Sequence, residues 1–144
     1  MIAYYALFEP DLKHGGFVVT FPDLNHGATQ GETIHEAIEM AEDLLRCIVS
    51  ELMKGGEKLP RPLKYRGKNH RLISLPALQS AKAELYSAFR IAGIKKTELA
   101  RRIGIPKTNV ERLFDLDHAS RFDQIEAAFR AIGKKIEVRI SDAA

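Results

Sequence analysis

The stretch Ile94-Lys-Lys-Thr-Glu-Leu-Ala-Arg-Arg-Ile-Gly-Ile-Pro-Lys-Thr-Asn-Val-Glu-Arg-Leu113 predicts two short helices joined by a tight turn. This is the arrangement of a DNA-binding helix-turn-helix, which places its second helix in the major groove. Leu99 and Ile103 are four residues apart and therefore share one face of the first helix. Gly104 supplies the backbone freedom that the turn needs, and Pro106 suits the beginning of the second helix.

The polar residues of this stretch are the candidate DNA contacts. They are Lys95, Lys96, Arg101, Arg102, Lys107, Thr108, Asn109 and Arg112. At the start of the second helix, asparagine can pair bidentately with adenine and lysine can contact guanine, whereas Lys96 suits a phosphate. The alternative interpretation is that Lys96, Arg101 and Arg102 form an ordinary solvated helix face.

Charge is divided unevenly along the chain. Residues 1–60 hold four Lys or Arg against ten Asp or Glu, and residues 61–144 hold eighteen against nine. The net charge of +3 therefore conceals an acidic half of −6 and a basic half of +9. A basic half suits DNA phosphates, and an acidic half suits a basic protein partner.

Length and composition limit the class of protein. At 144 residues, one domain or two small ones are expected. The single cysteine, Cys47, excludes an internal disulfide, and the N-terminus lacks the pattern of a signal peptide. No apolar run reaches the length of about 20 residues that spans a bilayer. We expect a cytoplasmic protein.

The first half reads as a small α+β domain with the order β-β-β-α-β. Strands are predicted at 3–8, 17–21, near His26 to Thr29, and at 70–75. Thr33 and Glu36 form a capping box that opens a long amphipathic helix. Residues 55–70 are rich in Gly and Pro and are the most linker-like stretch of the chain.

The second half reads as a helical domain with one strand at its end. Helices are predicted at 78–92, in the helix-turn-helix, and at 121–132, where Ser120 is the expected cap and Phe122 points inward. Alternating residues then predict a strand, and a second copy of the chain is its simplest partner. The predicted dimerisation residues are Ile136, Val138 and Ile140.

The N-terminal half resembles the HicB antitoxin family. The run Gly15-Gly-Phe-Val-Val-Thr-Phe-Pro-Asp-Leu24, then Gly27, Thr29-Gln-Gly31 and Thr33-x-x-Glu36-Ala37, is similar to the motif of that family's N-terminal domain. The resemblance covers roughly residues 1–75 and implies a partial RNase H-like fold. It also implies a C-terminal DNA-binding domain, which here looks like the helix-turn-helix of phage repressors. The expected domains are therefore 1–75, toxin-binding, and 76–144, for DNA binding and dimerisation.

The resemblance further implies a function. HicB-type proteins bind HicA toxins, which are small basic ribonucleases that cut mRNA, and they repress their own operon. We therefore expect an antitoxin that works as a dimer or a tetramer, with a HicA-type toxin and double-stranded operator DNA as partners, and no membrane. The candidate toxin-binding residues are Asp23, Glu32, Glu36 and Glu39.

The alternative functions for the first half are a nuclease and a small-molecule sensor. A nuclease needs several carboxylates that converge on Mg²⁺, whereas Glu9, Asp11 and Asp23 fall at strand ends and turns. A small-molecule sensor attached to a repressor is the main alternative, although no sequence motif indicates a ligand. The five histidines show no metal-ligand spacing, so the sequence predicts no enzyme activity, no cofactor and no metal.

Overall fold

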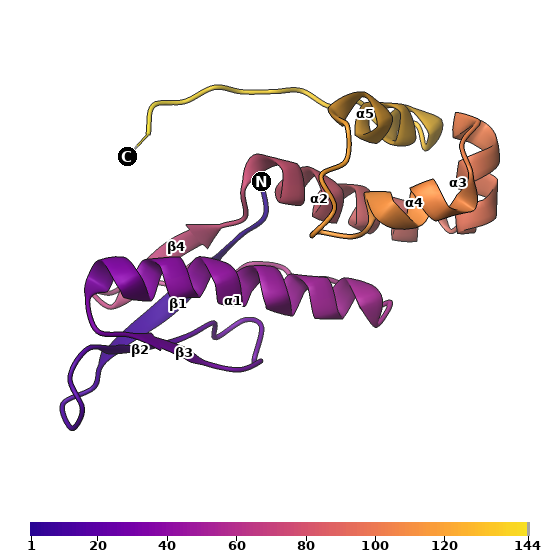
Figure 1. Ribbon diagram of the computed structural model, residues 1–144. Coiled ribbons are helices and arrows are strands. Elements are labelled where there is room, and N and C mark those ends of the chain that lie inside the picture. Colours follow the sequence, from indigo (N-terminus) through magenta and orange to yellow (C-terminus); the bar gives the residue numbers. More distant parts are fainter. Residues whose placement is uncertain (144) are drawn as a thin grey trace.

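The computed structural model describes residues 1–143 and has an α+β fold, as the sequence predicts. A four-stranded antiparallel sheet and a long helix form the N-terminal part, and four shorter helices follow (Figure 1). The strands are β1 (Ala3–Pro10), β2 (Phe17–Thr20), β3 (Thr29–Gly31) and β4 (His70–Ser74). The helices are α1 (Ile34–Lys54), α2 (Ala77–Ala92), α3 (Lys96–Ile103), α4 (Lys107–Leu113) and α5 (Phe122–Ala131).

The sheet has the order β3-β2-β1-β4. Strand β1 therefore lies inside the sheet and pairs with β2 on one side and with β4, which is distant in sequence, on the other. Tyr5 is opposite Leu72 in the β1–β4 pair, and Leu7 is opposite Thr20 in the β1–β2 pair. The third strand lies at 29–31 rather than at the predicted 26–29. Asn25 and Gly27 adopt positive φ angles of 49° and 60°, which interrupt an extended strand before that point.

Helix α1 covers one face of this sheet. Alternate residues of β1, namely Tyr4, Ala6 and Phe8, are buried against it. The predicted cap at the start of α1 is confirmed, since Thr33 Oγ1 accepts the N–H of Glu36 at 3.2 Å. The carboxylate of Glu36 reaches back to the N–H of Glu32 at 2.8 Å, one residue earlier than in a standard capping box.

Residues 55–69 do not behave as the linker that their composition indicated. They connect α1 to β4 within the N-terminal domain and are packed onto it. Leu59 is buried in the main core, and the hydroxyl of Tyr4 donates to the carbonyl of Pro60 at 2.7 Å. Burial of Leu59 and this long-range bond fix a stretch that contains many Gly and Pro residues.

The main hydrophobic core extends past residue 75. It includes Ala83 and Tyr86 from α2 and Leu116 from the turn after α4, together with the sheet and α1. Leu85, also on α2, belongs to a second cluster with Leu113 of α4 and residues of α5. Helix α2 therefore contributes to both cores. The division of the chain at 75/76 stays a prediction.

Two expectations about α5 are wrong. Ser120 is buried and bonds to the carbonyl of Arg112 at 3.4 Å, so Arg121 occupies the cap position without a side-chain hydrogen bond. Phe122 is 47% exposed rather than inward-facing. The hydroxyl of Ser120 is directed toward the end of α4 instead of toward the first turn of α5, so it does not cap α5.

The predicted C-terminal strand is not formed within the chain. After α5, residues 134–143 extend away from the helices without regular structure (Figure 1). A strand needs a hydrogen-bonded neighbour, and no part of residues 1–143 pairs with this segment. Ile136 is partly buried against the helical core, whereas Val138 and Ile140 are 70% and 87% exposed.

Candidate nucleic-acid interface

The turn between α3 and α4 has the geometry that the sequence predicts. Gly104 adopts a left-handed φ of 79°, and its N–H donates to the carbonyl of Ala100 at 2.8 Å. Pro106 occupies the position before α4 in an extended conformation. The turn is therefore three residues long, and the two helices can approach closely over it.

The two helices are held together by a small core. Leu99, Ala100 and Val110 are buried in one cluster, with Phe89 and Phe114 partly buried against it. The second helix therefore packs on the first. Leu113 instead enters the neighbouring cluster with Ile125 of α5, so α4 is supported from two sides. Rigid support of this kind fixes the direction of its outward side chains.

The structure brings most of the predicted DNA contacts to the surface of the α3–α4 pair. Lys95, Lys96, Lys107, Thr108 and Arg112 are exposed, and Asn109 is half-buried. The ammonium of Lys96 lies 6.0 Å from the ring centroid of Phe114, and the Nζ of Lys107 lies 3.9 Å from the carboxylate of Glu111. Arg112 makes no ion pair with any of residues 1–143.

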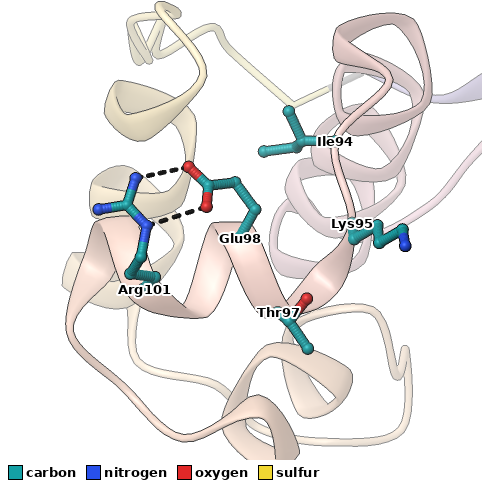
Figure 2. A pocket seen from close by; sticks show the side chains of 5 residues that line it. All are labelled: Ile94, Lys95, Thr97, Glu98 and Arg101. Carbon is teal, nitrogen blue, oxygen red and sulfur yellow. Dashed lines mark hydrogen bonds and ion pairs between the residues drawn. The ribbon is translucent and has the colours of Figure 1, made fainter.

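Glu98 is the residue that sequence reasoning missed. Its carboxylate accepts two hydrogen bonds from Arg101, at 2.9 and 2.6 Å (Figure 2). It accepts a third from Arg102 at 3.0 Å. These donors lower the pKa of Glu98 to about 2. The signal was present in the sequence, because a glutamate three and four residues before two arginines shares their helix face. Both arginines are therefore partly neutralised in the free protein.

Arg102 also has a structural contact. Its guanidinium donates to the carbonyl of Ala131 at 3.1 Å, at the C-terminal end of α5. This bond satisfies a carbonyl that has no partner within the helix. Arg102 therefore joins α3 to α5, whereas Lys96 lies over the ring of Phe114 and the exposed Lys95 makes no ion pair among the described residues.

Lys82 is a buried lysine that the sequence did not distinguish from the surface ones. Its side chain extends from α2 and is fully buried. Its ammonium donates to three backbone carbonyls, one in the last turn of α4 and two in the turn that follows it. The acceptors are Arg112 at 3.0 Å, Asp115 at 2.6 Å, and His118. Burial lowers the pKa of Lys82, while the nearby Asp115 and Asp117 oppose that change. Lys82 thus caps α4 from below.

The turn after α4 also contacts the N-terminal domain. Leu116 is buried in the main core, and Arg46 of α1 forms an ion pair with Asp117. Together with the hydrogen bonds of Lys82, these contacts connect both α1 and α2 to residues 112–118, at the end of α4. The end of α4 is therefore supported by both α1 and α2.

The predicted acidic residues fall into two groups. Asp23 is used internally, because its carboxylate accepts the N–H of Leu63 at 2.8 Å and the hydroxyl of Tyr65 at 2.6 Å. Glu32 and Glu36 line a cleft of about 350 Å³ beside the β1–β2 hairpin, and Glu39 is exposed on α1 nearby. The structure therefore brings three of the four candidates to one region and separates Asp23 from them.

The fold redistributes the charge that the sequence halves indicated. Residues 61–75 hold five basic and no acidic residues, and they include β4 of the sheet and precede the four C-terminal helices. Residues 1–75 therefore carry a net charge of −1, and residues 76–144 carry +4. The acidic side chains remain concentrated on α1. The difference in charge is therefore between parts of the surface, and not between the two halves of the sequence.

Among residues 1–143, no group of three or more His, Cys, Asp or Glu side chains is arranged to hold a metal ion. The helices of the same residues include none with the length and apolarity needed to cross a membrane.

Comparison with known proteins decides the family. The model of the HicB_like antitoxin of bacterial toxin-antitoxin systems matches residues 3–84. Antitoxin HicB of Escherichia coli (strain K12) is 38% identical over 124 residues, which cover 86% of this chain and 89% of that protein. This chain belongs to the HicB-like antitoxin family. Antitoxin HicB 1 of Photorhabdus laumondii subsp. laumondii is 34% identical, over 95% of this chain and 86% of its own length.

A solved structure was also matched. A chain of a toxin-antitoxin complex from Streptococcus pneumoniae aligns with a TM-score of 0.46 and 22% identity, and covers 76% of this chain and 93% of that one. The curated relatives are antitoxins and not enzymes, which confirms the expectation that this HicB-like chain is not an enzyme.

The family motif of this HicB-like chain has a structural explanation. A Cβ atom at Gly31 would lie 2.4 Å from the backbone nitrogen of Ala37, and one at Gly16 would lie 2.3 Å from the carbonyl oxygen of Gly31. Both glycines allow β2, β3 and α1 to approach closely, and Thr33 caps the helix at the same place. The motif therefore builds the junction of sheet and helix, beside the cleft that Glu32 and Glu36 line.

Proposed function

We propose that this antitoxin neutralises a small basic HicA-type mRNA-cleaving toxin and represses its own operon by binding operator DNA. The observation that carries the proposal is membership of the HicB-like antitoxin family, with curated relatives matched over most of their length. The match of a toxin-antitoxin system family implies a toxin as partner. The DNA-binding part rests on the α3–α4 pair and its exposed basic residues.

In this proposal α4 enters the major groove. Lys107, Thr108 and Asn109 lie at its start and contact base edges, and Arg112 contacts a base or a phosphate one turn later. Lys95 and Lys96 precede and begin α3 and contact phosphates. Arg101 and Arg102 contribute less to DNA affinity than two free arginines would, because Glu98 forms an ion pair with both.

The test of DNA binding compares two substitutions in the full chain. Asn109→Ala is expected to reduce the preference for the operator over random DNA. Lys96→Ala is expected to weaken binding to every sequence and to reduce the slope of log K against log salt by about one. Fluorescence anisotropy with the DNA upstream of the gene, at several salt concentrations, measures both. Equal losses on operator and random duplexes for Asn109→Ala would refute the base contact.

The toxin-binding surface is placed on the acidic side of the N-terminal domain. Glu32, Glu36 and Glu39 lie beside or near the cleft at the start of α1, and a basic protein is attracted to such a surface. Asp23 is left out of this surface because Leu63 and Tyr65 occupy its carboxylate. Glu39→Lys is expected to weaken the complex with the toxin from the adjacent gene, measured by calorimetry.

The control for that substitution is Glu126→Lys, an equal charge change on the exposed face of α5. It is expected to leave the affinity for the toxin unchanged. If both variants lose affinity equally, net charge rather than this surface would explain the attraction. If no small basic protein co-purifies with the chain, the toxin part of the proposal fails.

Dimerisation is assigned to the C-terminal segment. Val138 and Ile140 are highly exposed apolar residues on a segment without regular structure, with Ile136 anchoring its beginning. Pairing with the same segment of a second copy satisfies its backbone groups and covers these side chains. Two copies of α4 placed about 34 Å apart would then read an inverted repeat.

A further inference from the structure

A second basic surface lies outside the α3–α4 pair. It consists of residues 61–71, here called the basic segment, and its cationic residues are Arg61, Lys64, Arg66, Lys68 and Arg71. All five are exposed, and none forms an ion pair within the described part of the chain. The sequence contains no acidic residue between Glu57 and Glu84, so this charge is not balanced locally.

The backbone of the basic segment is held in place. Asp23 accepts the N–H of Leu63 and the hydroxyl of Tyr65, at 2.8 and 2.6 Å, and the N–H of Phe8 donates to the carbonyl of Asn69 at 2.7 Å. The carboxylate of Asp23 is thus engaged by neutral donors, and within residues 1–143 it forms no ion pair with the cations of the segment. Because the chain is already ordered, a ligand would not have to pay the entropic cost of ordering it.

Aromatic side chains lie within the same segment. The rings of Tyr65 and His70 are stacked, with centroids 5.1 Å apart and planes at 5°, and Tyr5 meets Tyr65 edge-on at 6.3 Å. Tyr5 alternates with the buried Tyr4 and Ala6, so this group lies on the sheet face opposite α1. Leu72, paired with Tyr5 on β4, is 51% exposed beside it.

We propose that the basic segment binds single-stranded nucleic acid. Exposed cations along an ordered chain contact phosphates, and half-buried aromatic rings on an open sheet face offer a surface on which unpaired bases stack. A duplex keeps its bases stacked on each other and would make no use of the rings. The site is independent of the proposed function and is separate from the α3–α4 pair in the fold.

The test measures binding of the full chain to labelled 12-nucleotide RNA and DNA single strands and to a duplex, by fluorescence anisotropy at several salt concentrations. Lys64→Glu with Arg66→Glu and Lys68→Glu is expected to reduce single-strand affinity at least tenfold. The slope of log K against log salt should fall by about two for three phosphates. The matched control reverses three exposed lysines elsewhere on the N-terminal domain, Lys13, Lys54 and Lys58.

Tyr65 provides a second, uncharged test. Tyr65→Leu removes the ring and is expected to reduce single-strand affinity by about five- to hundredfold, whereas Tyr65→Phe keeps the ring and loses only the bond to Asp23. Circular dichroism and thermal unfolding establish that each variant is folded. A loss with Tyr65→Leu that Tyr65→Phe does not share supports stacking.

The other outcomes are equally distinct. Binding to either RNA or DNA strands supports the proposal, and the stronger of the two identifies the natural ligand. No single-strand binding by the unchanged protein at low salt overturns it. So does an equal loss with the control reversals, or a loss of single-strand binding when Lys107→Ala and Arg112→Ala are made in α4, which would place that binding on the α3–α4 pair.

Discussion

The ammonium of Lys82 donates to the carbonyl oxygen of Arg112 at 3.0 Å, from beneath the helix that carries Arg112 on its outer face. The same ammonium satisfies the carbonyls of Asp115 and His118. One buried side chain of α2 therefore completes the end of α4. Lys82 holds the backbone of Arg112 in place, and the side chain of Arg112 stays exposed on the outer face of α4.

The first prediction concerns this lysine. Lys82→Met keeps the length of the side chain but removes the charged donor that three partly buried carbonyls share. The free energy of unfolding is expected to fall by about 2–4 kcal/mol, measured by urea denaturation. Lys54→Met, at the exposed end of α1, is the control and should change it by less than about 0.5 kcal/mol. Equal, small effects would show that the carbonyls find water instead.

The second prediction concerns Glu98. Glu98→Gln removes the acceptor charge that Arg101 and Arg102 share, so duplex DNA is expected to bind more tightly and with a steeper salt dependence. Glu51→Gln on α1 removes the same charge without freeing an arginine and should have a smaller effect. If both variants bind alike, the ion pairs do not restrain the arginines.

The same ion pairs predict a dependence of stability on pH. The pKa of Glu98 is about 2 in the folded chain and 4.5 for an unperturbed glutamate. Its contribution to stability is therefore complete above about pH 4.5 and is lost as the pH falls toward 2. The unfolding temperatures of the unchanged protein and Glu98→Gln should differ at neutral pH and converge over that range. A constant difference would contradict this assignment.

The third prediction uses two neighbouring glycines. Gly15 and Gly16 have φ angles of 77° and 74°, so alanine carries the same conformational cost at both positions. A Cβ at Gly15 meets nothing within 4 Å, whereas one at Gly16 meets the carbonyl oxygen of Gly31. Gly16→Ala should therefore cost about 1–3 kcal/mol more than Gly15→Ala in thermal or urea unfolding. Similar costs would mean that β2 and β3 can separate freely.

The fourth prediction concerns the C-terminal segment. Val138→Asp is expected to lower the molecular mass in solution from that of a dimer or tetramer, measured by light scattering after gel filtration. Leu12→Asp is the control, because Leu12 is 97% exposed on the hairpin and lies far from the segment in sequence. An unchanged mass for Val138→Asp would remove this segment from the dimer interface.

The parts of the fold that depend on local signals were predictable. Thr33 caps α1 with its side-chain hydroxyl and Gly104 ends α3 in a left-handed conformation, and both signals are local. The spacing of Leu99 and Ile103 likewise predicted the inner face of α3. Residues 55–69 were not predictable, because their order depends on Tyr4 and Asp23, which are far away in the sequence.

The candidate site shows the same limit. The exposure of Lys95, Lys107 and Arg112 follows from helical periodicity, which the sequence contains. The role of Lys82 does not, because a buried lysine is unusual and its three acceptors come from a turn about thirty residues later. The strand expected at 136–140 also depends on a partner that the sequence of one chain does not specify.

The contribution of α2 to both cores limits how such proteins can exchange their C-terminal helices. A recombination joint placed at residue 75 would separate Ala83, Tyr86 and Leu116 from the sheet and long helix that bury them. In a viable chimera, α2 from one parent would have to fit the core residues of the other parent, and the turn that contains Leu116 would have to fit the sheet and α1. Shuffling between relatives should therefore succeed only among parents that keep both surfaces of this helix.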